Sequence, residues 1–414
     1  MAEPSRDVDP AGSNSGAHGC TPRCRDVAGA PAPDKHIAQF DGLRGLLALW
    51  VVIAHILSFC GYADVAIPRP FGMAWAVFVD AVTAVDVFII LSGFVITFQL
   101  RERRPSYVKF MVGRVFRIYP VYLVCLGIGI GVASFAPVVV ESKTWQNTAF
   151  VQWFGGACAE EQNRLGPHVA AHLTLLFGLL PALVLPHATA TLLAPAWSLS
   201  LEWQYYLVAP LIARMLYGGK GLVVLALVSW LGIRYGHLWQ NPHLAFLPAQ
   251  LPLFLVGIAS YHLFAHFRDR SNIDGAGSTL PSGGLLAVAL VVPWHSVSLT
   301  IWAIGFGSVF ARGNDGFARL LRAVRWALSH AVLQGLGRLS YPLYLVHWPL
   351  LILFQYILIS CWPDASSKQA LVVMFCCGLP TILLASHVLH LMVEAPAMAM
   401  GKRWTRARGH PVAR

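Results

Sequence analysis

The chain has 414 residues, of which 57% are hydrophobic and 12% are charged, and its formal net charge is +11. A soluble domain carries about twice this fraction of charged residues, so the composition excludes an ordinary soluble protein and predicts an all-α, polytopic membrane protein. The basic residues lie in short loops between apolar segments, which is typical of membrane topology signals and argues against nucleic acid as a partner.

The two ends of the chain differ from the rest in composition. Residues 1–36 are rich in Gly, Ala, Pro and Ser and contain no long apolar run, so we predict a disordered cytoplasmic tail. The spacing of Cys20 and Cys24 fits no zinc pattern, and no metal site is predicted. The membrane domain is expected over residues 37–398, followed by a basic cytoplasmic tail over 399–414.

Ten apolar segments are candidates for membrane spans. They cover residues 43–60, 73–99, 117–140, 196–217, 221–236, 244–264, 284–296, 297–311, 339–360 and 371–393. An eleventh segment, 169–186, is interrupted by two prolines. The arginine-rich loops and the C-terminal tail all fall on the cytoplasmic side only if this segment does not cross. We therefore predict about ten transmembrane helices, one re-entrant or interfacial piece, and both termini in the cytoplasm.

Arg44 and His55 lie eleven residues apart in the first apolar segment. Eleven residues turn an α-helix through about 1100°, so the two side chains share one face, about 16 Å apart along the axis. Ionisable groups inside a membrane span usually mark a functional site. The alternative is a hydrogen-bonded core histidine together with an arginine that anchors the helix end, and helix geometry alone does not decide between the two.

Arg114 and Arg117 are spaced i, i+3, so one helix face can present both guanidinium groups. Paired guanidinium groups suit phosphate, because each forms two charge-assisted hydrogen bonds. The alternative is that these residues only anchor the helix and orient it in the membrane.

Several polar side chains lie where burial is costly. Asp86, inside the second span, must be paired, protonated or facing water, and an imidazole would be a suitable partner. Glu202 begins the fourth span near the expected outer face, where with Tyr206 it can bind a polyhydroxylated acceptor, orient a base, or simply cap the membrane boundary. Tyr344 and His347 share a helix face at i, i+3, and His347 is either a second proton carrier or a structural histidine.

Six stretches in order along the chain resemble the bacterial acyltransferase-3 family, whose members are integral membrane enzymes that acylate hydroxyl groups, often of sugars. The stretches are FDGLRGLLALWVVIAH, VDVFIILSGFVIT, GRVFRIYPVYL, PAWSLSLEWQYYLVAP, LGRLSYPLYLVHWPLL and VEAPAM, between residues 40 and 398. The family's arginine–histidine motif falls on Arg44 and His55, and its arginine-x-x-arginine motif falls on Arg114 and Arg117. The family usually has two acidic residues in the fourth-span motif, whereas here Trp203 follows Glu202.

The resemblance implies transfer of an acyl group, most simply acetyl, from cytoplasmic acyl-CoA to a carbohydrate hydroxyl, in the bacterial inner membrane. The acceptor would be an exopolysaccharide, an O-antigen or a lipid-linked glycan, and no permanently bound cofactor is expected. Three roles are then expected: catalysis by His55, Glu202 and Asp86; binding of the coenzyme A phosphates by Arg44, Arg114 and Arg117; substrate binding by Tyr206, Tyr344 and His347. Two alternatives stay open, namely acylation of a small secondary metabolite such as a macrolide sugar, and a transporter or flippase for a glycan precursor.

Overall fold

The computed structural model describes residues 37–63, 71–142, 148–216, 219–236, 244–270, 295–313 and 315–407. Every regular element in these ranges is helical, which confirms the all-α prediction. The predictions for the tail 1–36, for residues 284–294 and for residues 408–414 lie outside the described part of the chain.

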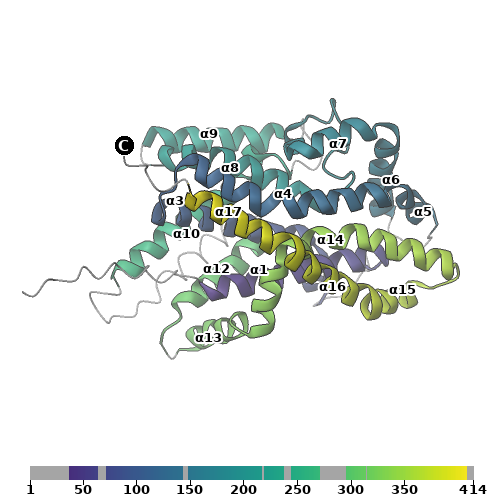
Figure 1. The fold of residues 1–414 in the computed structure, drawn as a ribbon. Coiled ribbons are helices and arrows are strands. Elements are labelled where there is room, and N and C mark those ends of the chain that lie inside the picture. Colours follow the sequence, from purple (N-terminus) through teal and green to yellow (C-terminus); the bar gives the residue numbers. More distant parts are fainter. Residues whose placement is uncertain are drawn as a thin grey trace, which may run out of the picture. The chain divides into compact units, whose positions relative to one another are not determined.

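The helices are labelled in Figure 1 in the order in which they follow along the chain. They are α1 (Ala38–Phe59), α2 (Phe71–Val79), α3 (Ala81–Glu102), α4 (Tyr107–Val132), α5 (Ala136–Glu141), α6 (Thr148–Asn163), α7 (Leu165–Thr174), α8 (Trp197–Met215), α9 (Gly219–Tyr235), α10 (Leu247–Arg270), α12 (Ser296–Phe310), α13 (Gly316–Leu328), α14 (Ala331–Cys361), α15 (Ser367–Val373), α16 (Leu379–Leu389) and α17 (Ala395–Ala407). Short 3-10 or π-helical turns connect several of them.

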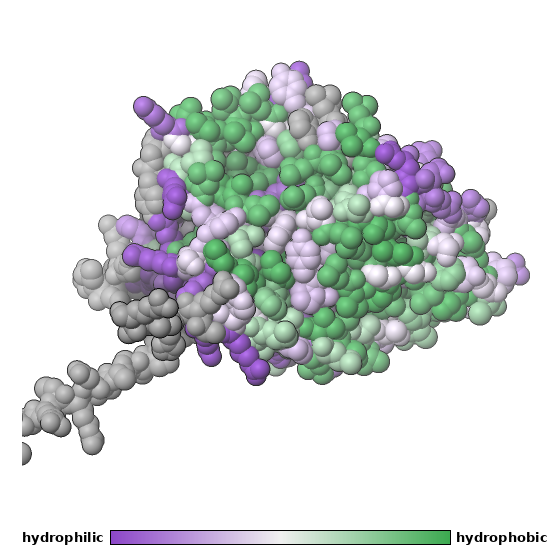
Figure 2. Space-filling view, turned by 45° about the horizontal axis from the view of Figure 1, so that its top comes forward, coloured by the Kyte–Doolittle hydropathy of each residue, from purple (hydrophilic) through white to green (hydrophobic). Residues whose placement is uncertain are grey.

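Six helical stretches among the described residues are long and apolar enough to cross a membrane. They are Ala38–Phe59, Ala81–Glu102, Tyr107–Glu141, Leu247–Arg268, Ala331–Cys361 and Ser367–Arg406. Shorter apolar helices cover Val223–Tyr235 and Ser296–Phe310. Figure 2 shows a broad apolar band across the visible face, with hydrophilic residues gathered at its two ends, as a bilayer requires. The structure thus supports a membrane protein, whereas the count of about ten spans stays a prediction.

The predicted span 73–99 is wrong as a single helix, because the chain breaks at Asp80 into α2 and α3. The Asp80 carboxylate accepts hydrogen bonds from the backbone N–H of Val82, at 2.9 Å, and from the hydroxyl of Thr83, at 2.7 Å. An aspartate in this position caps the first turn of the following helix. Asp80 therefore ends one helix and starts the next within a continuous apolar sequence.

Helices α1 and α14 lie side by side and run parallel (Figure 1). Their contacts keep a nearly constant sequence offset: His55 meets His347, 292 residues on, and Gln355 donates to the Phe59 carbonyl, 296 residues back. Glycines allow this close approach, because a Cβ on Gly45 would lie 2.4 Å from the Leu333 carbonyl oxygen. The pair α3 and α10 packs in the same way at Gly93 and Gly257. These close contacts fix the helices that carry the candidate site.

The predicted re-entrant segment 169–186 forms no membrane-length helix. Helix α7 ends at Thr174, and the chain continues through turns to the 3-10 turn Ala194–Ala196. Three residues of this connection, Leu175, His187 and Leu192, have φ of 56°, 54° and 57°, in the left-handed region that bulky side chains rarely adopt. Such backbone persists only when its surroundings hold it in place. Its depth in a bilayer stays part of the prediction.

Candidate active site

Two pockets share one wall at the centre of the helical unit. The first, the arginine pocket, encloses about 880 Å³ including its open mouth and is lined by residues that include Arg44, Ser92, Arg114, Arg117, Glu202 and Tyr206. The second, the histidine pocket, encloses about 800 Å³ and is lined by residues that include His55, Trp153, Thr189, Pro195, Trp197 and Trp348. Among the described residues, Val85 and Tyr344 line both pockets. Together the two volumes have the size of ligand sites for small molecules.

Three arginines from two helices meet in the arginine pocket. Arg44 extends from α1 and lies 3.5 Å from the Asp41 carboxylate, whereas Arg114 and Arg117 extend from α4. The Arg114 guanidinium lies over the ring of Tyr206, 5.2 Å from its centroid, and donates a hydrogen bond to Gln99. The structure thus brings together the three arginines predicted to bind phosphate, although α4 and α1 are far apart in sequence.

Glu202 faces these arginines and not His55. Its carboxylate accepts a hydrogen bond from the Ser92 hydroxyl at 2.6 Å, and another from the hydroxyl of Tyr206. Glu202 lines the arginine pocket and His55 lines the histidine pocket, so no described contact lets Glu202 orient the histidine. Ser92 belongs to this polar group, and nothing in the sequence around it distinguishes it from other serines in apolar segments.

His55 and His347 form a hydrogen-bonded pair between α1 and α14. His347 is completely buried, and its Nδ1 lies 3.0 Å from the Leu343 carbonyl oxygen, to which it donates. Its Nε2 is therefore the acceptor of the 2.9 Å hydrogen bond from Nδ1 of His55. This arrangement leaves Nε2 of His55 unprotonated, which is the form a general base requires.

His347 lies behind His55 and lines neither pocket, so the structure does not place it at the predicted substrate-binding position. Asp86 also lines neither pocket. It is buried on α3 and accepts hydrogen bonds from Nδ1 of His295 at 2.8 Å and from the Ser298 hydroxyl at 3.0 Å. The imidazole expected beside Asp86 is thus His295, 209 residues away, rather than His55.

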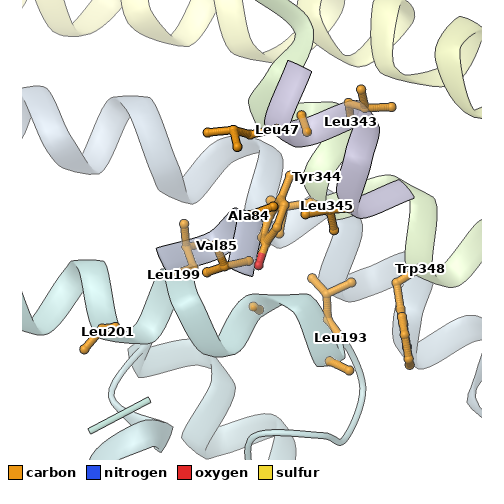
Figure 3. Packing of buried hydrophobic residues seen from close by; sticks show 14 of the residues in the cluster. Leu47, Ala84, Val85, Leu193, Leu199, Leu201, Leu343, Tyr344, Leu345 and Trp348 are labelled. Carbon is orange, nitrogen blue, oxygen red and sulfur yellow. The ribbon is translucent and has the colours of Figure 1, made fainter. Parts of the chain in front are cut away.

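Tyr344 occupies the boundary between the pockets. Its hydroxyl donates to the Pro195 carbonyl oxygen at 2.9 Å and lies 2.8 Å from the Ser198 hydroxyl, which can donate to it. In Figure 3 the phenol of Tyr344 points toward Val85 in the middle of the buried cluster. Tyr344 thus lines both pockets, and its predicted role in substrate binding stays a prediction, whereas Val85 carried no signal that separated it from other buried valines.

Three tryptophans surround the histidine pocket, and sequence reasoning assigned none of them to the site. Trp153 comes from α6, Trp197 from the start of α8 and Trp348 from α14. No Asp, Glu, Lys or Arg side chain is among the described residues that line this pocket. His55 therefore faces a pocket whose described lining is rich in aromatic side chains and carries no charged side chain.

A buried polar cluster holds the turn segment 175–193 against helices α6 and α7. Nε2 of His172 donates to the Ala188 carbonyl oxygen at 3.1 Å, and Nδ1 of His168 lies 3.0 Å from the Thr191 hydroxyl. The Glu161 carboxylate accepts from the backbone N–H of Leu192 at 2.9 Å. This segment supplies Thr189 to the histidine pocket and leads directly to Pro195, so the cluster fixes one wall of that pocket.

Acidification is expected to loosen this wall. Burial lowers the pKa of His172 to about 3, well below its value in an unfolded chain. Stability is therefore complete above about pH 6.5 and falls as the pH drops below that value, because only the unfolded chain then binds the proton. At pH 5 the loss amounts to about 2 kcal/mol. In thermal unfolding of detergent-purified protein, His172→Gln should lose less stability than wild type between pH 7.5 and pH 5.

The matched control is His387→Gln, because His387 is exposed on α16. This variant should follow the wild-type pH dependence. An equal pH-dependent loss in His172→Gln and wild type would show that His172 is not the titrating group.

Comparison with known families identifies the chain. The profile of the acyltransferase domain of the acyltransferase-3 family matches residues 37–391. The chain belongs to the acyltransferase-3 family. The resemblance inferred from the six sequence stretches is confirmed, and the protein is an acyltransferase.

The chain is similar to acyltransferase MdmB of Streptomyces mycarofaciens. It is 25% identical over 405 residues, covering 89% of this chain and 93% of the relative. No solved structure matches the chain. The acyltransferase-3 match spans α1 to α16, so it includes every helix that lines the two pockets.

Proposed function

We propose that this protein transfers an acyl group, most simply acetyl, from cytoplasmic acyl-CoA to a hydroxyl of a carbohydrate. The observation that carries the proposal is the junction of two pockets, one holding three arginines and the other a histidine with an unprotonated Nε2. The arginine pocket takes the donor and the histidine pocket takes the acceptor. The reacting groups then meet where Val85 and Tyr344 line both spaces.

The arginine pocket suits the phosphates of coenzyme A. Guanidinium groups bind phosphate through paired charge-assisted hydrogen bonds, and three of them converge here. Tyr206, bonded to Glu202, keeps Arg114 in place in the absence of donor, and the Glu202 carboxylate limits the net charge of the pocket. The mouth of this pocket belongs on the cytoplasmic side, where acyl-CoA is found and where the basic loops are expected.

His55 acts as the base in the transfer. Nε2 takes the proton of the acceptor hydroxyl as its oxygen attacks the carbonyl carbon of the thioester. The carbon–sulfur bond then breaks, and the leaving coenzyme A thiolate takes the proton from Nε2, which restores neutral His55. His347 is a positioning residue, because its hydrogen bond fixes the tautomer and the orientation of the His55 ring.

The walls of the histidine pocket support an uncharged acceptor. Indole rings pack against the apolar faces of sugar rings, and no cation for an acidic sugar is found among the described residues of the lining. The same walls favour a second candidate acceptor, a sugar attached to an apolar secondary metabolite such as a macrolide.

Removal of one phosphate-binding arginine should weaken donor binding. Arg114→Gln and Arg117→Gln are each expected to raise the KM for acetyl-CoA about 10- to 100-fold, since a hydrogen bond to a charged group contributes about 1.5–3 kcal/mol. With S-acetylpantetheine, which lacks the nucleotide and its phosphates, each variant should match wild type. The measurement is release of free thiol by membranes supplied with an acceptor-containing cell extract.

The control is Arg214→Gln, because Arg214 is exposed in the last turn of α8 and does not line the pocket. Loss of activity toward S-acetylpantetheine equal to that toward acetyl-CoA would contradict the phosphate role. A transporter or flippase would release no thiol from either donor, and that result would overturn the proposed function.

A further inference from the structure

Two buried side chains form the boundary between the two pockets. Val85 and Tyr344 are 3% and 8% exposed, respectively, and they are the described residues that contact both spaces. The donor and acceptor must meet at this boundary, because the arginines line one pocket and His55 lines the other. Resting on the proposed function, we propose that Val85 and Tyr344 determine acyl-chain specificity by limiting the size of the acyl group that passes between the pockets.

Tyr344 is held against one side of the passage. Its hydroxyl is bonded to the Pro195 carbonyl oxygen and lies within hydrogen-bond distance of Ser198, so rotation of the ring would break both contacts. The ring also packs edge-on against Phe88, with centroids 6.2 Å apart. The phenol is therefore a fixed wall rather than a mobile one.

Val85 is held from the opposite helix. A valine in a helix has one strongly preferred rotamer, so its two methyl groups cannot move aside easily. The next residue, Asp86, is bonded to His295 and Ser298, and these hydrogen bonds fix the rotation of α3 at this level. The role of buried Asp86 is therefore structural: it holds α3 in place and does not contact the reacting groups.

Because the donor enters from the arginine pocket, this passage selects acyl groups by their size. With the phosphates held by the arginines, the acyl end of the donor is the part that reaches the boundary. Every carbon beyond the thioester carbonyl must then fit between Val85 and Tyr344. In a tight apolar site one methylene group changes the rate by about 10- to 200-fold, so wild type should strongly prefer the shortest acyl groups.

The experiment compares chain-length profiles of valine variants. Membranes carrying wild type or Val85→Ala receive a fixed cell extract as acceptor source and labelled acetyl-, propionyl-, butyryl- or hexanoyl-CoA. Labelled product is measured by mass spectrometry. Val85→Ala should raise the ratio of butyryl to acetyl transfer at least 10-fold, because it removes two methyl groups from the passage.

Two matched valines complete the test. Val51 lines only the histidine pocket and Val95 only the arginine pocket, so Val51→Ala and Val95→Ala should keep the chain-length ratio within 3-fold of wild type, whatever their rates. If Val85→Ala does not accumulate in membranes, Val85→Ile supplies the opposite change and should lower the ratio of propionyl to acetyl transfer at least 5-fold.

The possible results separate the two claims. Acetyl transfer by all variants with the same chain-length profile would overturn the role of the boundary and leave the proposed function intact. A shift in all three valine variants alike would also overturn it, because the effect would then belong to the pockets in general. Failure of wild type to transfer any acyl group would overturn the proposed function and the filter with it.

Discussion

His55→Gln is expected to reduce kcat for acyl transfer about 10²- to 10⁴-fold, the range that general-base catalysis contributes. Glutamine can occupy the space of the imidazole and form hydrogen bonds, but it cannot accept the proton of the attacking hydroxyl. The KM for acetyl-CoA should stay within 3-fold of wild type, because His55 lines the other pocket. Steady-state kinetics in membranes, with expression matched by immunoblot, measures both quantities.

The partner histidine provides the control for this prediction. In His347→Gln the amide oxygen can replace the acceptor nitrogen that faces Nδ1 of His55, so most activity should remain. His347→Leu fills the same buried volume without an acceptor and should lower kcat at least 10-fold, with an unchanged KM for the donor. Equal activity of the glutamine and leucine variants would contradict the positioning role of His347, and full activity of His55→Gln would contradict the catalytic assignment.

The sequence predicted those parts of the site that depend on spacing along one helix. Arg44 and His55 share a helix, and the expected displacement of about 16 Å agrees with their positions in two adjoining pockets. Arg114 and Arg117, at i, i+3, line one pocket as expected. Helical periodicity dictates these relations, so they need no knowledge of the fold.

The sequence could not predict which residues on different helices contact one another. Ser92 and Glu202 are 110 residues apart, and Asp86 and His295 are 209 residues apart. Periodicity places each residue on a face but does not say which faces meet. Glu202 was accordingly expected near the acceptor, whereas packing of α8 against α3 and α4 directs it toward the arginines.

The parallel packing of α1 on α14 is the physical condition for the histidine pair, and it predicts a second large effect. In Gly45→Ala the new methyl group would lie 2.4 Å from the Leu333 carbonyl oxygen and 2.7 Å from the Gly337 nitrogen, so the two backbones must separate. Forced overpacking costs about 1–3 kcal/mol and occasionally more. The Tm in detergent should fall by about 5 °C or more. Separation of the helices should also stretch the bond between His55 and His347, so kcat should fall with stability.

Gly127→Ala is the matched control, because a Cβ at Gly127 on α4 would meet no atom within 4 Å. Alanine is the better helix former by about 1 kcal/mol, so this variant should be as stable as wild type or slightly more stable. Equal Tm values for the two variants would mean that α1 and α14 can move apart without loss. The close approach of these helices would then not be what holds the two imidazoles within hydrogen-bonding distance.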